Sequence, residues 1–414
     1  MPKHPPASSL IVLAALVPIT GTRAQTTWTV TQQNGVQAAI AAAAPGDVIL
    51  LPNTGGFPDY TPFAVTKGVT IRGNGCRVGW PLGASSTFEL TIQVPLGERA
   101  HLDGLDLTWS QHSGGNIGMR IVHNGGVASV QRCNVLYAGG DAARIAGGAI
   151  VFQSCSLHAQ RVSGIAVIGT AAGVFVQGGN VTVRDSSVHG FDAGIFWFGG
   201  HAIAQSAQPG ADLVGGSLHA ERSTFVGGSG VTSISFLVGG CGVRTSGAAA
   251  MWLGDCTLAG GSTAGLATGG PALCNNGGTT AHLANVTLSP GVPGAPPSTG
   301  SVNPAAPLVR LALAPAFQRG ATSTLAFAGE PGALFVLGLA LDAAPTLHPF
   351  LVEPVWIVAN VPVALGLLDA TGGATFAVAV PAGPSLQNQL VFCQAISGFA
   401  LPLRASTIAG GLIP

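Results

Sequence analysis

One short segment gathers more chemistry-bearing side chains than its surroundings. Residues 189–201 hold His189, Asp192, Trp197 and His201, in a chain with only 16 acidic residues, 10 histidines and 6 tryptophans. A carboxylate and imidazoles can move protons or hold hydroxyl groups, and an aromatic face can pack under the C–H surface of a sugar. The segment therefore predicts a ligand site, for a glycan or for acid–base chemistry.

The same residues also fit a purely structural role. Phe196 and Phe198 flank Trp197 as in a strand whose phenylalanines point inward, and the histidines then sit at polar corners. His158 occupies the position of His189 in the preceding sequence repeat, so the two imidazoles are expected to stack. Both interpretations remain open at this stage.

Charge is scarce in this chain. Lys, Arg, Asp and Glu make up 8% of the 414 residues and the formal net charge is zero, whereas roughly 25% of an ordinary soluble domain is charged. A basic nucleic-acid binder is therefore not expected. Hydrophobic residues reach 47%, and this apolar content argues against disorder.

The first 24 residues predict a secretory signal peptide. Lys3 and His4 precede an apolar stretch from Leu10 to Ile19, and Thr22 and Ala24 place small residues before a cut after position 24. The alternative is an unstructured N-terminal tail. No later apolar run is long enough to predict a membrane span. Export permits disulfides, but the seven cysteines are an odd number and lack zinc-type spacing, so no metal site is predicted.

Short segments repeat along the chain at intervals of roughly 20 to 40 residues. Each copy begins apolar, has a small or apolar residue three positions later, and has an apolar residue two positions after that. Copies begin at Leu102, Val130, Phe152, Val183, Ala220, Leu253 and Leu283. Strand-length segments with glycine-rich turns and no helical periodicity predict a parallel β-helix, a solenoid whose coils stack.

The fourth column of the aligned copies is predicted to point inward as a ladder of small side chains. It consists of Leu105, Cys133, Cys155, Ser186, Ser223, Cys256 and Val286. We expect buried free thiols in this column, because free cysteine behaves as a small hydrophobe. A disulfide between Cys133 and Cys155 is the alternative.

The second and third columns are polar. The second places Arg184 beside Glu221, and the third places Asp185 beside Arg222. Opposite charges on neighbouring coils predict a solvent-facing ladder, in which each pair contributes a few tenths of a kcal/mol.

A terminal cap precedes the repeats. Val36–Ala44 predicts a short helix that ends before Pro45 and Gly46, and it is suited to cover the open end of the solenoid. The stretch GVQAAIAAAAPGDVILLP…FAVTKGVTIRGNG resembles the opening of secreted right-handed parallel β-helix proteins of the pectate-lyase-like superfamily. The resemblance implies an all-β fold, a right-handed parallel β-helix with an N-terminal capping helix. It implies no single activity, because this fold carries lyases, hydrolases, adhesins and binding proteins.

The activities best known for this fold need residue patterns that the chain lacks. Lyases of this fold pair an Arg or Lys base with Ca²⁺ on clustered aspartates, and hydrolases need two or three carboxylates at one sugar bond. The hydrolase signatures Asn-Thr-Asp, Asp-Asp and Gly-His-Gly do not occur in the sequence. Asp103 and Asp106 are the nearest carboxylate pair, and their spacing in a strand predicts opposite faces. No cofactor is predicted, and Ca²⁺ enters only under a lyase alternative.

The C-terminal quarter has a different composition. Ser289–Pro307 is rich in Pro, Gly, Ser and Ala and predicts a linker. Strand-like runs beyond it predict a small β-sandwich, which resembles the C-terminal β-domains of exported proteins from environmental bacteria. The runs are Ser323–Ala328, Ala333–Leu341, Val355–Val358, Ala374–Val380 and Gln389–Ala395. The predicted organisation is a signal peptide (1–24), a parallel β-helix (25–288), a linker (289–307) and a sandwich-like domain (308–414).

Two functional hypotheses follow. The preferred one is a secreted or cell-surface, non-enzymatic β-helix that acts as an adhesive or glycan-contacting module, with polysaccharide or cell-surface glycan as its partner. The alternative is a polysaccharide lyase or glycoside hydrolase with a diverged site near His189–His201. Under either hypothesis, His189, Asp192, Trp197 and His201 are the candidate ligand-binding residues.

Overall fold

The computed structural model describes residues 9–12 and 25–413, apart from 57, 80–87, 109–116, 123–124, 139, 161–170, 199–200, 232–237, 264–267, 279, 305–308, 341–342, 347–349, 352–354, 358–360, 384–385, 387–388 and 402. The chain divides into two compact units. One is formed by residues 25–305, and the other by residues 306–414 together with β1 (Ser9–Val12).

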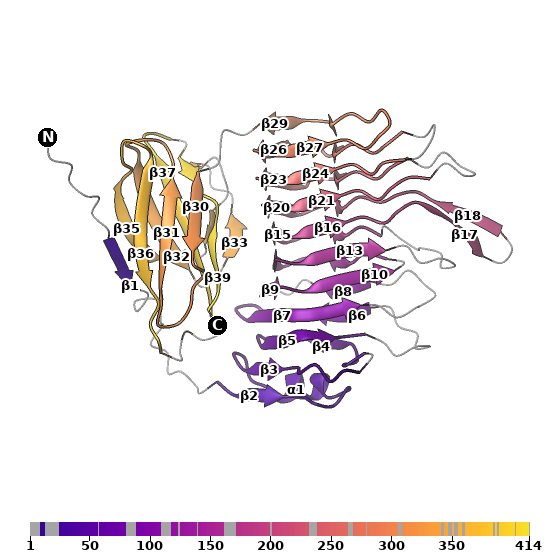
Figure 1. Cartoon of the computed structure of the whole chain (residues 1–414), viewed down its shortest axis with the longest axis horizontal. Helices are drawn as coiled ribbons and strands as arrows, with labels where there is room; N and C mark the ends of the chain where they lie inside the picture. The colour runs from indigo at the N-terminus through magenta and orange to yellow at the C-terminus, as the bar shows by residue number, and fades with distance from the viewer. Residues whose placement is uncertain are drawn as a thin grey trace. The chain divides into compact units, whose positions relative to one another are not determined.

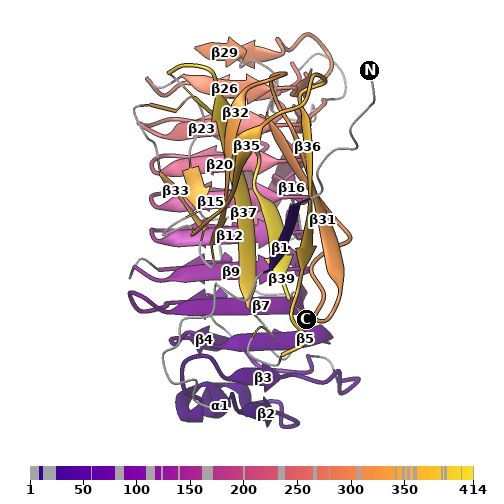
Figure 2. The ribbon, with the colours of Figure 1, turned by 90° about the vertical axis from the view of Figure 1, so that its left-hand side faces the viewer.

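Residues 25–305 form a parallel β-helix whose coils stack strand on strand (Figure 1), with the N-terminal coils at one end and β29 at the other (Figure 2). The strands lie in three rows. The first row consists of β2 (Thr27–Thr29), β3 (Val48–Leu50), β5 (Thr70–Arg77), β7 (Arg99–Thr108), β9 (Val127–Gln131), β12 (Ala149–Gln153), β15 (Asn180–Arg184), β20 (Ser217–Glu221), β23 (Ala250–Gly254), β26 (Ala281–Ala284) and β29 (Val302–Pro304).

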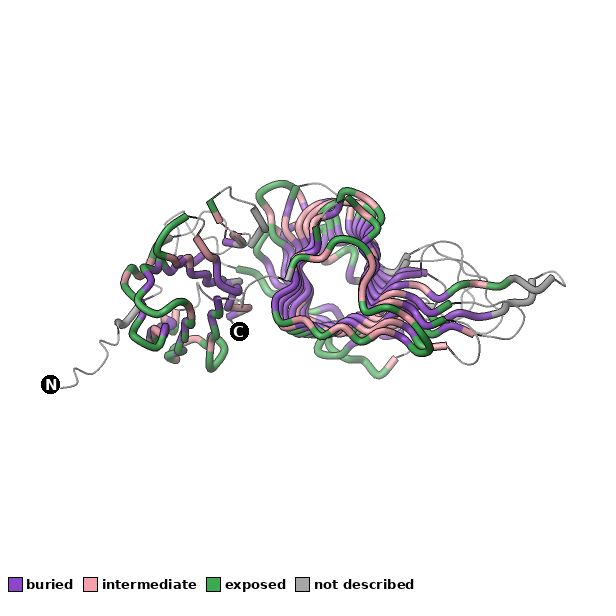
Figure 3. The backbone as a smooth tube through the Cα atoms, turned by 90° about the horizontal axis from the view of Figure 1, so that it is seen from above, coloured by how far each residue is buried: buried purple, intermediate pink, exposed green. Residues whose placement is uncertain are grey.

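The second row continues the same sheet past a corner, and the third row is a separate sheet. The second row consists of β10 (Asn134–Ala138), β13 (Ser156–Gln160), β16 (Ser187–His189), β21 (Thr224–Val226), β24 (Thr257–Ala259) and β27 (Thr287–Ser289). The third consists of β4 (Phe63–Val65), β6 (Phe88–Ile92), β8 (Ile117–Ile121), β11 (Ala143–Ile145), β14 (Val174–Val176), β19 (Ala211–Leu213), β22 (Val243–Thr245), β25 (Leu273–Asn275) and β28 (Ser298–Thr299). Inward side chains from all three rows form one continuous apolar core. Seen along the axis, residues coloured as buried recur from coil to coil around the ring (Figure 3).

One residue per coil turns the chain from the first row to the second. These corner residues have φ between 47° and 54° and are Arg132, Ser154, Asp185, Arg222, Asp255 and Asn285. A positive φ is sterically costly for most residues and easiest for Gly, Asn and Asp. The corner bends the strand, so side chains three positions apart across it can both point inward.

Strand β7 bends at the equivalent position, where Gly104 has φ 66°. Leu102 and Leu105 therefore both enter the core, and Asp103 and Asp106 both lie on the outer side. The prediction that these aspartates face opposite ways is wrong, because strict alternation holds only for an unbent strand.

The inward column after the corner is confirmed, and its side chains have a further role. Cys133, Cys155 and Cys256 are buried free thiols. Ser186 Oγ donates to the carbonyl of Arg184 at 2.6 Å and accepts from the backbone N–H of Cys155 at 3.0 Å. The small polar or sulfur side chain thus satisfies backbone groups at the corner. Burial raises the pKa of Cys155 and Cys256 to about 12, so these thiols stay protonated.

Glycine is abundant because backbones touch where one coil passes to the next. The N–H of Gly240 donates to Gly228 O, and the N–H of Gly261 donates to Gly240 O, each at 2.8 Å. A Cβ at Gly228 would lie 1.8 Å from the carbonyl oxygen of Phe191, and one at Gly261 would lie 1.8 Å from that of Gly228. Only glycine fits such positions, which accounts for part of the 62 glycines in the sequence.

Both ends of the solenoid depart slightly from the sequence-based boundaries. The capping helix α1 covers Val36–Ala42, two residues shorter than predicted, and buries Val36 and Ile40. The predicted linker at 289–307 is largely another coil, because β28 pairs with β25 and β29 pairs with β26. Its Pro and Gly residues form turns within that coil, and the two units divide after Ala305.

The second unit is a β-sandwich. One sheet has the order β1, β36 (Gly373–Ala379), β31 (Thr322–Ala328), β30 (Arg310–Ala314). The other has the order β35 (Val361–Leu367), β32 (Leu334–Ala340), β37 (Leu390–Gly398), β38 (Arg404–Ala405), with β39 (Ala409–Leu412) also paired to β37. A hairpin of β33 (Ala343–Thr346) and β34 (Val355–Ile357) accompanies them. Phe335 and Phe376 pack across the two sheets with ring centroids 5.4 Å apart.

Candidate functional site

The outer face of the second row presents the same chemistry on successive coils. We call the first outward residue of its strands the hydroxyl column, formed by Ser156, Ser187, Thr224, Thr257 and Thr287. Each residue lies directly beside the next in the parallel register. Asn134 continues the column towards the N-terminal end. We call each of these five Ser and Thr residues a rung. Neighbouring strands lie about 4.8 Å apart, so the five rungs cover about 19 Å along the axis.

Most of these hydroxyl groups are available to a ligand. Ser156, Thr257 and Thr287 are exposed and Thr224 is half-buried, and within the described residues none of the four side chains forms a hydrogen bond. Ser187 is the exception, since its Oγ lies 2.9 Å from Nε2 of His189.

A second outer column runs beside the hydroxyl column, two residues further along each strand. It consists of Leu136, His158, His189, Val226, Ala259 and Ser289. The first five are half-buried and Ser289 is exposed, and three of the six are apolar. His158 and His189 lie beside each other on neighbouring coils, as predicted: they are register partners with ring centroids 5.0 Å apart, and their ring planes are tilted by 45° rather than stacked. Burial lowers the pKa of both imidazoles, although the nearby Asp192 carboxylate partly opposes this. Both rings are therefore neutral at pH 7.

The corner residues form a third outer column, in which charges are compensated. Arg222 donates to both carboxylate oxygens of Asp185, at 2.7 and 2.9 Å, which confirms the predicted pair. Asn285 Nδ2 donates to Asp255 at 2.6 Å.

Arg184 and Glu221 also lie side by side, but the prediction that they face solvent is wrong. Their residues are only 3% and 2% exposed. Glu221 faces three cationic or donor groups, with His219 Nε2 at 3.1 Å, Arg184 Nε at 3.5 Å and Arg222 at 3.7 Å. Burial alone would raise the pKa of Glu221, but these neighbours lower it, so the carboxylate stays ionised inside its own cluster.

The four residues singled out in the sequence are only partly brought together. His189 borders the hydroxyl column, and Asp192 follows it in an exposed position, where its Oδ1 accepts the backbone N–H of Ser229 at 2.7 Å. Trp197 and His201 lie on a hairpin of β17 (Gly194–Phe198) and β18 (His201–Gln205) that leaves the coil beyond β16 (Figure 1). The side chains of Trp197 and His201 lie outside the described part of the structure.

Sequence reasoning missed the hydroxyl column, although its signal was present. The fifth position of the aligned repeats holds Asn, Ser, Ser, Thr, Thr and Thr in six successive copies. A column of one chemical type indicates a shared environment. Cysteine in the adjacent column was more conspicuous because it is the rarer residue.

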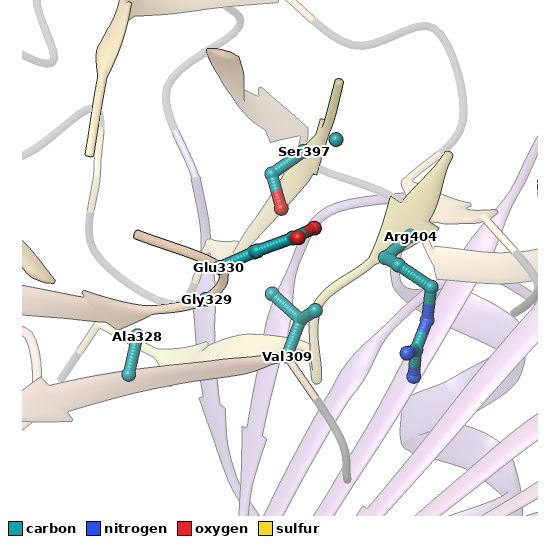
Figure 4. A pocket seen from close by; sticks show the side chains of 7 residues that line it. Val309, Ala328, Gly329, Glu330, Ser397 and Arg404 are labelled. Atoms are coloured by element: carbon teal, nitrogen blue, oxygen red, sulfur yellow. The ribbon is translucent and has the colours of Figure 1, made fainter. Parts of the chain in front are cut away.

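The remaining features offer weaker sites. A cavity of about 370 Å³ in the sandwich is lined by Val309, Ala328, Gly329, Glu330, Ser397, Gly398 and Arg404 (Figure 4). The described residues of its wall include neither an aromatic ring nor a repeated polar group. Across the described residues, His, Cys, Asp and Glu side chains do not gather in threes as a metal site would require. Among the helices that the structure describes, none is long and apolar enough to cross a membrane.

No protein-family model matches the chain, and no curated protein sequence matches it. Among solved structures, it is similar to the tailspike protein gp49 of Acinetobacter baumannii bacteriophage Fri1, a capsular polysaccharide depolymerase. The match has 10% identity and a TM-score of 0.28, and covers 95% of this chain and 85% of that one. Such a likeness carries no argument about activity.

Proposed function

We propose that this protein is an exported, non-enzymatic β-helix that contacts glycans through the outer face of its second strand row. One observation carries the proposal. Four of the five side chains in the hydroxyl column, all but Ser187, form no hydrogen bond within the described residues, and the second outer column beside them includes the half-buried Val226 and Ala259. Sugars present hydroxyl edges and C–H faces together, and this pairing of columns complements both.

The carboxylates near this face favour binding over catalysis. Asp185 is held by Arg222, Asp255 by Asn285, and Asp192 by a backbone N–H. A glycoside hydrolase needs two carboxyl groups facing one sugar bond, and a lyase needs a base beside the uronate carbon. Engaged carboxylates are poorly suited to either role.

Export is part of the proposal. The apolar N-terminal stretch fits a signal peptide, and the Cys241–Cys274 disulfide between neighbouring coils fits an oxidising compartment. A bacterial cell-surface or secreted location agrees with both features.

A glycan array combined with a polysaccharide-degradation screen tests this function on the purified chain. We expect retention of at least one polysaccharide without release of products. Trp197→Ala should weaken retention about ten-fold if the β17–β18 hairpin contributes a stacking ring, since losing such a contact costs about 1–2 kcal/mol. Leu96→Ala, which trims an 82% exposed side chain, serves as the control. Formation of unsaturated or reducing products would instead support the lyase or hydrolase alternative.

A further inference from the structure

We infer that the hydroxyl column binds an extended, uncharged polysaccharide that runs along the solenoid axis, with about one contact per coil. This inference rests on the proposed function and names its ligand class and binding direction. Three observations carry it: the repeat of the hydroxyl groups, the compensation of the neighbouring charges and the half-buried apolar side chains of the second outer column.

The repeat sets the direction of the ligand. The rungs from Ser156 to Thr287 are consecutive register partners, so the same hydrogen-bonding group recurs at every strand spacing of about 4.8 Å. A ligand that itself repeats, with a unit close to this spacing, can meet every rung. An extended chain of pyranose units satisfies that condition when it lies parallel to the axis, whereas a chain lying across the coils would meet one rung only.

The charged side chains near the hydroxyl column favour an uncharged polysaccharide as the ligand. A polyuronate carries one carboxylate per sugar and needs a cation on nearly every coil to hold it. The described corner column offers Arg132 and Arg222, and both guanidinium groups already hold aspartates, Asp103 and Asp185 respectively. The whole chain has zero net charge, so it also lacks the field that would attract a polyanion.

The apolar side chains of the second outer column favour a sugar as the ligand, because a sugar has C–H faces as well as hydroxyl groups. Val226 and Ala259 are half-buried and follow Thr224 and Thr257 by two residues on their own strands, and Leu136 follows Asn134 in the same way. The exposed Ser289 follows Thr287. The three apolar side chains give the C–H faces of the sugar rings a surface to cover, while the hydroxyl groups exchange hydrogen bonds with the ring edges. Neutral imidazoles at His158 and His189 interrupt this strip without adding charge.

Binding titrations with oligosaccharides of defined length test the inference. The probes are neutral β-1,4-linked gluco-, manno- and xylo-oligosaccharides from dimer to hexamer, and oligogalacturonates of the same lengths. We expect affinity for one neutral series to rise with each added unit up to about the pentamer, because five rungs cover about 19 Å. That affinity should change little with salt, since no ion pairs form.

Two threonine substitutions test the rungs. Thr224→Val and Thr257→Val remove a hydroxyl group but keep the β-branched shape, so each should weaken pentamer binding roughly three- to ten-fold. Thr257→Ser keeps the hydroxyl group and should bind within about two-fold of the parent. Circular dichroism and melting temperature confirm that each variant is folded.

The possible outcomes distinguish a failure of this inference from a failure of the proposed glycan-binding function. Tighter, salt-sensitive binding of oligogalacturonates, or affinity that stops rising at the dimer, would overturn the inference while leaving glycan binding intact. Unchanged neutral-glycan binding in both valine variants would do the same by placing the site elsewhere. If the parent chain retains no glycan on the array, the proposed function itself fails.

Discussion

The hydroxyl group of Ser186 is the hydrogen-bond acceptor for a buried backbone N–H of the neighbouring coil. Its Oγ lies in the inward column and accepts the N–H of Cys155 from the preceding coil at 3.0 Å. Ser186→Ala should leave that buried N–H without an acceptor, whereas the Arg184 carbonyl keeps a second donor, the N–H of Ser154. An unsatisfied buried donor costs about 1–3 kcal/mol, so we expect about 2 kcal/mol of lost stability.

Urea denaturation of the full chain, followed by tryptophan fluorescence, measures the change. Ser186→Cys is the matched control, because Cys155 and Cys256 occupy the same column, and it should cost less than about 1 kcal/mol. Ser156→Ala makes the same chemical change at an exposed position and should stay within about 0.5 kcal/mol of the parent. If the alanine and cysteine variants at position 186 lose equal stability, the column fills space only and the hydrogen-bonding argument is refuted.

Two further predictions concern the covalent link and the histidine pair. Peptide mapping without reduction should recover Cys241 linked to Cys274, and Cys241→Ser should lower stability by about 3 kcal/mol by freeing the closed loop; a reduced pair in exported protein would contradict the assignment. Burial lowers the folded-state pKa of His158 and His189, so the unfolded chain binds protons more readily. Their stabilising effect is therefore complete above about pH 6.5 and falls as pH drops through the folded pKa values. Denaturation between pH 7 and 5 should show a flatter profile for a His158→Asn/His189→Asn variant, and an unchanged profile would refute this.

The fold was predictable because its signal repeats. Each coil buries the same positions, so the inward column and the strands follow from local sequence. The capping helix, predicted over Val36–Ala44 and observed over Val36–Ala42, follows from its helix-favouring residues. The wrong prediction for Asp103 and Asp106 concerns a bend of the backbone, which the alternation of residues along a strand does not specify. The corner at Gly104 turned Asp103 outward together with Asp106, and strict strand alternation contains no information about such a bend.

The site was harder to predict because its evidence is spread over many coils. His189 could be predicted because its imidazole can bind a ligand or move a proton. Its neighbour His158 could be predicted because it occupies the same position in the preceding repeat. The hydroxyl groups of Thr224 and Thr257 are unremarkable singly, and only their register makes them a surface. Whether a Ser or Thr hydroxyl group is free or internally bonded, as in Ser187, is fixed by tertiary contacts that sequence patterns do not report.

The corner residue links the fold to the proposed site. Asp185 or Arg222, with a positive φ, directs the next side chain inward, Ser186 or Ser223, and the one after it outward, Ser187 or Thr224. The rung is thus defined two residues after the corner, whatever the length of the segment that connects one coil to the next. Those connections vary widely, and the β17–β18 hairpin inserts into one of them, yet the rungs stay in register. Insertions between coils can therefore change what borders the surface without disturbing the spacing of its hydroxyl groups, and this property suits a surface that contacts a repeating polymer.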